Sequence, residues 1–232
     1  MHPAPTQNAP RPREVAKKTR ASRVAEDLRG SILSGRDAPG SKVNLDHMRA
    51  RFGVSLSPMR EAISRLVADG LVQFEDQRGY RIAPVSRANL AEVTRLRADL
   101  ESLALRHAIA AASIEWEADL LAALHRSRRE THSDIDAACG AFHAALTAGC
   151  PLPMLGRYCA TLRALHLRYG NLLDYSDAAR DFAAEHATIA EAAIARNAEL
   201  APALLKQDIE RTGRRMAALM PADPPDPQRT AT

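Results

Sequence analysis

The sequence predicts a mainly α-helical protein in two parts. A small N-terminal domain of three helices and a β-hairpin precedes an antiparallel all-α helical bundle. Two observations predict this fold class. Alanine is abundant and aromatic residues make up only 4% of the chain, which favours helix over sheet. Apolar residues recur at helical spacing along most of the chain, whereas strand-like alternation is confined to residues 71–76 and 80–84.

The first two helices are delimited by capping and turn residues. A helix is predicted from about Ser22 to Leu33, followed by the Asp-Ala-Pro-Gly segment 37–40, which has proline and glycine where a type II turn requires them. Asn44 is the predicted N-cap of a second helix that ends at Gly53.

A third helix follows this glycine after a short turn. Ser57 is its predicted N-cap, which would place Pro58 at the first helical position. The apolar stripe consists of Met59, Ala62, Ile63, Leu66 and Val67. Arg60 lies off this stripe, so we expect its side chain to face solvent.

The two alternating runs that follow are separated by Gln77-Arg78-Gly79, which indicates a β-hairpin. Three short helices with a glycine turn before the third, followed by a hairpin, predict a winged helix-turn-helix domain. In that fold the third helix enters the major groove of DNA. The alternative is a small helical subdomain whose arginines are merely solvated.

Charge is distributed unevenly between the two parts. Residues 1–82 carry 15 Lys and Arg against 9 Asp and Glu, a net charge of +6, whereas the remaining residues carry 17 against 19, a net charge of −2. A basic domain joined to a nearly neutral one suggests a module that binds a polyanion. The predicted organisation is a disordered arm (1–19), the winged helix-turn-helix domain (20–84), a linker (85–90), the helical domain (91–218) and a disordered tail (219–232).

The helical part is almost continuous from about Leu90 to Met216. Breaks are predicted near Ser113, at 132–134, at 150–153, near Gly170 and near Asn197. About six antiparallel helices would bury their apolar stripes as a bundle. The chain has no apolar run long enough for a membrane helix, no signal-peptide pattern and three cysteines that do not suggest a disulfide framework. We therefore expect a cytoplasmic protein without membrane association.

The N-terminal part resembles the DNA-binding domain of GntR-type transcriptional regulators. The most specific elements are PG, GVS, SPMREA and RGYRIAP. The following segments LAEVTRLRADLESLALRHAI and AFHAAL resemble the helical effector domain of the FadR subgroup, called FCD. The resemblance covers residues 22–215. It implies a homodimer that binds a short pseudo-palindromic operator and senses a small molecule.

The resemblance also implies site residues in the N-terminal domain. Carried over by position, the DNA-contacting residues are Arg49, Ser55, Ser57, Arg60 and Gly79. Among these, Arg60 is the recognition-helix arginine and Gly79 is the glycine at the tip of the wing. Many relatives carry an arginine at the position of Leu56, so their operator sequence cannot be transferred to this chain.

A divalent metal is often held inside FCD domains, on an acid or histidine four residues before the FH histidine and on two later histidines. Here Cys139 and His143 are four residues apart and would share one helix face. His186 and Asp208 are each 11 residues from the turn predicted at Asn197, which places them at the same height in a helical hairpin. This donor set suits zinc or another transition metal. Alternatively, His143 is a core histidine and Cys139 an inert buried thiol.

Four further residues are candidates for binding an effector. Arg97 matches a family position at the head of the helical domain, and Arg163, His166 and Arg168 lie on a middle helix that could face the bundle interior. A small carboxylate is the effector class that the resemblance implies. For each arginine alone, a solvated helix surface is the alternative.

The leading hypothesis is a sequence-specific, effector-responsive transcriptional repressor that is not an enzyme. One alternative is a metal-dependent hydrolase built on the metal-candidate residues, but the sequence offers no nucleophile elbow, phosphate loop or well-placed general base. The other alternative is a nucleoid-type protein that binds DNA without sequence preference.

Overall fold

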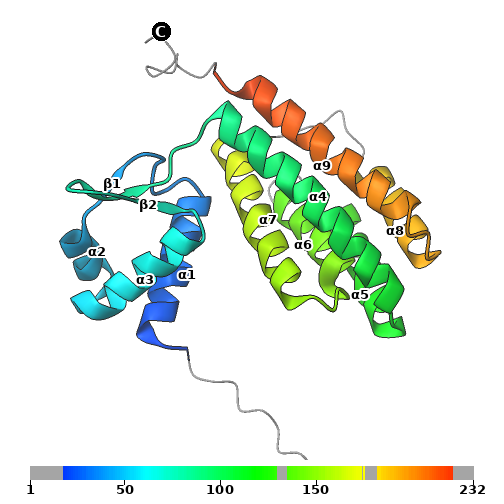
Figure 1. The fold of residues 1–232 in the computed structure, drawn as a ribbon, viewed down its shortest axis with the longest axis horizontal. Coiled ribbons are helices and arrows are strands. Elements are labelled where there is room, and N and C mark those ends of the chain that lie inside the picture. Colours follow the sequence, from blue (N-terminus) through cyan, green and yellow to red (C-terminus); the bar gives the residue numbers. More distant parts are fainter. Residues whose placement is uncertain (1–17, 130–134, 174, 176–181, 222–232) are drawn as a thin grey trace, which may run out of the picture.

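The computed structural model describes residues 18–129, 135–173, 175 and 182–221. A small N-terminal domain lies beside a larger helical domain (Figure 1), which confirms the predicted fold class. The predicted arm, except residues 18 and 19, lies outside the described residues. The same holds for the predicted break at 132–134 and for the tail from residue 222 onward.

The N-terminal domain combines three helices and a small sheet. Its elements are α1 (Arg20–Leu33), β1 (Lys42–Val43), α2 (Leu45–Phe52), α3 (Leu56–Ala68), β2 (Val72–Glu75) and β3 (Gly79–Ile82). The strands form an antiparallel sheet in the order β1-β3-β2, so β1 adds a strand to the predicted hairpin. The core includes Leu28, Ile32, Met59, Ile63, Leu66 and Ile82.

Capping residues explain where the short helices begin and end. The side chain of Asn44 accepts hydrogen bonds from the backbone N–H groups of Asp46 (3.0 Å) and His47 (3.1 Å), as predicted for the N-cap of α2. Gly53 ends this helix in the left-handed region, with φ of 62°. These two caps fix the length of α2 and the short turn into α3.

The predicted start of α3 is wrong by two residues. The helix begins at Leu56 with Ser55 as its N-cap, although no side-chain capping hydrogen bond forms. Pro58 is therefore the third residue of the helix rather than the first. A proline is tolerated there because the backbone N–H groups of the first turn have no intrahelical acceptor.

The helical domain packs its helices as an antiparallel bundle. Its elements are α4 (Arg87–Ala111), α5 (Ile114–Arg129), α6 (Ile135–Ala148), α7 (Pro153–Leu173), α8 (Phe182–Ile194) and α9 (Leu200–Leu219). The long helix α4 packs against both α9 and α7, and α5 packs against α6 and α8 (Figure 1). Across the described ranges, every helix is too short or too polar to span a membrane.

Most predicted boundaries of the helical domain agree with the structure. The breaks near Ser113, at 150–153 and near Asn197 are confirmed. The helix end predicted near Gly170 lies slightly later, at Leu173, because α7 continues through this buried glycine. Two predicted segments also contain helix: α4 begins at Arg87, inside the predicted linker 85–90, and α9 reaches Leu219, the first residue of the predicted tail.

The helical domain has a larger apolar core that includes Trp116 and Phe142, and a smaller one that includes Leu90, Tyr169 and Met216. The largest member of the larger core is Trp116, which is buried and donates a hydrogen bond from its indole nitrogen to the carbonyl of Ala145 at 3.0 Å. A Cβ atom at Gly149 would lie 3.0 Å from this ring, so the glycine allows α6 to approach closely. The bundle interior also holds buried charged side chains, among them Arg97, Glu101 and Asp208.

Candidate functional site

The outer surface of α3 presents an exposed arginine at the start of the helix. The guanidinium of Arg60 has no hydrogen bond or ion pair with any other described residue. Arg65, one turn later, pairs with Glu61 at 2.5 Å and donates to the Ser22 hydroxyl at 2.9 Å. The chain thus holds Arg65 in place and leaves Arg60 available, as a base-contacting arginine in the major groove must be.

The other predicted DNA contacts on α2 and α3 are exposed as well. Ser55 and Ser57 are exposed at the start of α3, where backbone N–H groups can donate hydrogen bonds to a phosphate. Arg49 is exposed on α2, with its Nε atom 3.1 Å from Asp46. Leu56 is half-buried, so it offers DNA an apolar surface and no hydrogen-bond donor.

The tip of the hairpin differs from the prediction in one respect. Gly79 pairs with Glu75 at the base of the turn, and its φ of 82° shows why glycine is required there. The tip is formed by residues 76–78. Arg78 is exposed at this tip, and sequence reasoning missed it although the residue lies in the quoted turn. An arginine at the tip of a wing has the chemistry that binds the minor groove.

A cavity of about 330 Å³ lies inside the helical domain. It is lined by residues from α4, α6, α7, α8 and α9, and seven metal and effector candidates line it: Arg97, Cys139, His143, Arg163, His166, His186 and Asp208. Arg168 does not line it and instead donates to the carbonyl of Ala83. A volume of this size accommodates a small molecule. The bundle therefore brings together residues that are more than 100 positions apart in the sequence.

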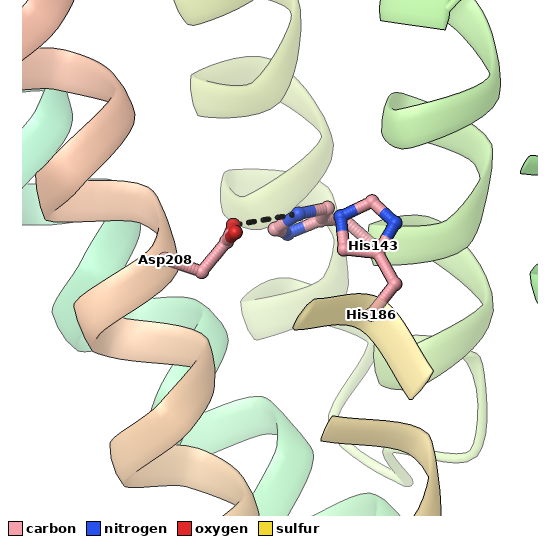
Figure 2. A group of neighbouring side chains, drawn as sticks. All are labelled: His143, His186 and Asp208. Carbon is pink, nitrogen blue, oxygen red and sulfur yellow. Dashed lines mark ion pairs between the residues drawn. The ribbon is translucent and has the colours of Figure 1, made fainter. Parts of the chain in front are cut away.

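Three of these residues form a compact group of potential metal ligands. The nearest ligand atoms of His143, His186 and Asp208 all lie within 4.8 Å of one another, and all three residues are buried. The Nε2 atom of His143 lies 3.2 Å from a carboxylate oxygen of Asp208 (Figure 2). Donors about 2 Å from one tetrahedral zinc ion are separated by roughly 3.3 Å. The distance between His143 and Asp208 therefore fits two ligands of a shared ion.

Cys139 lines the same cavity but does not belong to this group. It is half-buried on α6, one turn before His143. The predicted fourfold donor set is therefore present as three clustered ligands with a thiol nearby. The imidazole of His186 is held by stacking on the ring of Phe142, with a centroid separation of 4.2 Å.

A buried carboxylate connects the metal-candidate group to the effector candidates. Glu101 on α4 is fully buried, lies 3.3 Å from Nδ1 of His143, and pairs with Arg97 at 3.0 Å and Arg163 at 3.2 Å. Burial raises the pKa of Glu101, but Arg97, His143 and Arg163 outweigh burial and lower this pKa to about 2. Glu101 is therefore an ionised acceptor that orients His143, as carboxylates behind metal-binding histidines do.

His166 presents a buried hydrogen-bond donor that finds no acceptor among the described side chains and backbone. Its Nδ1 atom lies 3.0 Å from Arg97, which can only donate, so Nδ1 accepts. Burial and the neighbouring Arg97 hold the pKa of His166 well below its usual value, so the ring is neutral and its proton is on Nε2. Among the described residues, this buried Nε2 atom has no hydrogen-bond partner. An acceptor on a bound molecule would satisfy it.

The two sites together define a class of protein. An exposed winged-helix surface and a buried polar cavity in a helical domain are the parts of a DNA-binding regulator with a sensory domain. Comparisons with known proteins identify the family. Residues 20–82 match the model of bacterial regulatory proteins of the gntR family, and residues 92–211 match the FCD domain. The chain belongs to the GntR family of transcriptional regulators and carries an FCD domain.

Individual relatives agree with this assignment. The chain is 33% identical over 194 residues to the "uncharacterized HTH-type transcriptional regulator BphR" of Paraburkholderia xenovorans, covering 79% of each chain. It is 31% identical over 195 residues to the HTH-type transcriptional repressor GlaR of Escherichia coli, covering 78% of this chain and 89% of the relative. These relatives are regulators, so the hydrolase alternative is set aside.

Solved structures share the fold. A GntR-type regulator from Rhodococcus sp. RHA1 superposes with a TM-score of 0.69 at 25% identity, covering 87% of this chain and 99% of that one. McbR of E. coli superposes with a TM-score of 0.73 at 19% identity, with the same coverage. The two-domain architecture is thus shared at low sequence identity.

Proposed function

We propose that this regulator is a homodimeric repressor whose operator affinity is controlled by a small carboxylate bound beside a divalent metal in the helical domain. The observation that carries the proposal is the buried group of His143, His186 and Asp208 in the wall of a cavity of about 330 Å³. Histidines and an acid in this arrangement suit zinc. A metal would supply a Lewis-acidic position for an anionic ligand.

Charge balance supports an anionic effector. Arg97 and Arg163 are offset by Glu101 and Asp208, so these four groups carry no net charge. A bound divalent cation would add two positive charges in a buried place, which is costly without compensation. A carboxylate would offset this charge and would also accept a hydrogen bond from the unsatisfied Nε2–H of His166. These features support Arg97, Arg163 and His166 as effector-binding residues.

On the operator, Arg60 would contact a base edge. The domain would be positioned on the DNA backbone by Arg49, Ser55, Ser57 and the hairpin. Two copies related by a twofold axis would bind two half-sites, and effector binding would change their spacing. The name of the relative GlaR supports repression. We infer that the protein acts in the cytoplasm, where operator DNA is found.

Selection of bound sequences from random duplex DNA, with the full-length protein, tests the DNA-binding part. A short palindrome is the expected result, because a dimer reads the same half-site twice. Recovery without a motif, together with a steep dependence of affinity on salt, would instead indicate the nucleoid-type alternative.

Replacing both His143 and His186 by Ala tests the sensory part. We expect the double variant to lose bound metal, measured by elemental analysis after dialysis against zinc, and to retain its operator affinity. The matched control is His107→Ala with His125→Ala, two histidines of the helical domain that do not line the cavity. A His143/His186 variant that keeps its zinc content would overturn the proposed metal site.

A further inference from the structure

Helix α7 contacts the cavity and the DNA-binding domain with different faces. The α7 residues that line the cavity are Arg163, Ala164, His166, Leu167 and Gly170. The α7 residues that contact the DNA-binding domain or the segment leading into α4 are Leu165, Arg168, Tyr169, Asn171 and Leu172. At helical periodicity the two sets are centred on opposite sides of the helix, and Asn171 lies at the boundary between them. Figure 1 shows α7 as the bundle helix next to the N-terminal domain.

The contact between the two domains is specific. Leu165 packs against the core of the DNA-binding domain. Asn171 donates from its side-chain nitrogen to the carbonyl of Leu33, the last residue of α1, at 2.8 Å. Gly35 has a φ of +77°, and a Cβ atom there would lie 2.9 Å from Leu172. The end of α1 therefore rests directly on the end of α7.

Arg168 places a buried positive charge in this contact. Its side chain is only 3% exposed and donates to the carbonyl of Ala83, just after β3, at 2.6 Å. Within the described parts of the chain it has no carboxylate partner, and its Nε atom has no hydrogen-bond partner. A buried guanidinium without a counter-charge opposes burial, since it is better solvated in water. The docked arrangement is thus held by packing and opposed by this charge.

We propose that α7 is a joint that couples occupancy of the cavity to the orientation of the DNA-binding domain. This inference rests on the proposed sensory function of the cavity and adds the route by which the signal leaves it. A ligand on one face of α7 shifts the helix, and the opposite face, which holds α1 and Ala83, changes its fit to the DNA-binding domain. Because coupling is reciprocal, operator binding must change affinity at the cavity by the same factor.

Two glycine variants offer a matched test. In Gly35→Ala the new Cβ atom meets Leu172 and disturbs the joint. Gly40→Ala places the same residue at a nearly identical φ of +73° in the same domain, but nothing lies within 4 Å of its Cβ atom. Both variants carry the same kind of backbone strain, and only the first alters the contact with α7. Asn171→Ala is a second, unstrained perturbation, with exposed Gln207→Ala on α9 as its control.

The measurement is the zinc dissociation constant of the full-length protein, with and without saturating operator duplex. We expect operator to change it by about fivefold or more in the wild type and in Gly40→Ala, and by less than about twofold in Gly35→Ala. Asn171→Ala should lose part of the coupling, and Gln207→Ala none. Equal coupling in Gly35→Ala and Gly40→Ala, or no coupling in the wild type, would overturn the joint.

A second readout separates the joint from the proposed metal site. If the wild type binds no zinc, the metal part of the proposed function fails, and the joint is then judged by hydrogen exchange. Operator binding should change amide exchange in residues 165–173 of the wild type and Gly40→Ala, and leave it unchanged in Gly35→Ala. Unchanged exchange in all three proteins would overturn the joint independently.

Discussion

The two domains handle charge in opposite ways. Within described residues 18–86, Ser31 is the only buried polar or charged residue, and the basic side chains lie at the surface. The helical domain buries Arg97, Glu101, His143, His166, Arg168, His186 and Asp208. Surface charges attract a polyanion without first losing their water, whereas buried charges must be compensated inside the fold. The position of charge thus separates the DNA-binding role from the ligand-binding role.

The largest effect is expected from the removal of one buried charge. In Glu101→Gln, Arg97 and Arg163 lose their shared counter-charge, which should lower the free energy of unfolding by about 3–5 kcal/mol. Asp99→Asn on the same helix is the control, because the Asp99–Lys206 pair is exposed and should contribute less than about 1 kcal/mol. Denaturant unfolding measures both. Equal losses would show that burial does not distinguish the two pairs.

The second test removes one exposed charge. Arg60→Ala should weaken operator binding by about 1–3 kcal/mol and relax specificity at one base pair, with no loss of stability. Arg65→Ala is the control, since Arg65 is engaged with Glu61 and Ser22. Titration of a labelled operator and its single-base variants measures both. An unchanged affinity in Arg60→Ala would place α3 outside the groove.

The third test changes two glycines, and the smallest effect is expected at the second of them. Gly213 on α9 lies against α4, and a Cβ atom there would lie 2.4 Å from Thr94, so Gly213→Ala should cost about 1–3 kcal/mol of stability. Gly30 in α1 has open space around it, so Gly30→Ala should stabilise the protein by about 0.5–1 kcal/mol through helix propensity. Thermal unfolding measures both changes. A stabilising Gly213→Ala would mean that α4 and α9 can separate at no cost.

Features that depend on a few neighbouring residues were predictable from the sequence. Asn44, Gly53 and the turn at Asn197 act through hydrogen bonds and backbone angles within about one helical turn. The turn at Asn197 also placed His186 and Asp208 at equal height, and in the structure they belong to one buried group. Local signals therefore carried over to one part of the candidate site.

Features that depend on distant residues were not predictable. The start of α3 could not be located because Ser55 and Ser57 are equally suitable caps, and Gly170 gave no sign that its helix continues. Glu101 follows Arg97 at the spacing of an ordinary surface ion pair. Only its burial against α6 and α7 makes it the centre of the network, and neither this burial nor the α7 joint leaves a pattern in the sequence.

The packing of Trp116 has a practical consequence. It is the only tryptophan in the chain, and it is buried in the core of the helical domain, against the backbone of α6. Under selective excitation, the intrinsic fluorescence of this protein therefore comes from the helical domain alone. Tryptophan emission therefore reports on unfolding of that domain. Unfolding of the DNA-binding domain by itself would leave this emission unchanged.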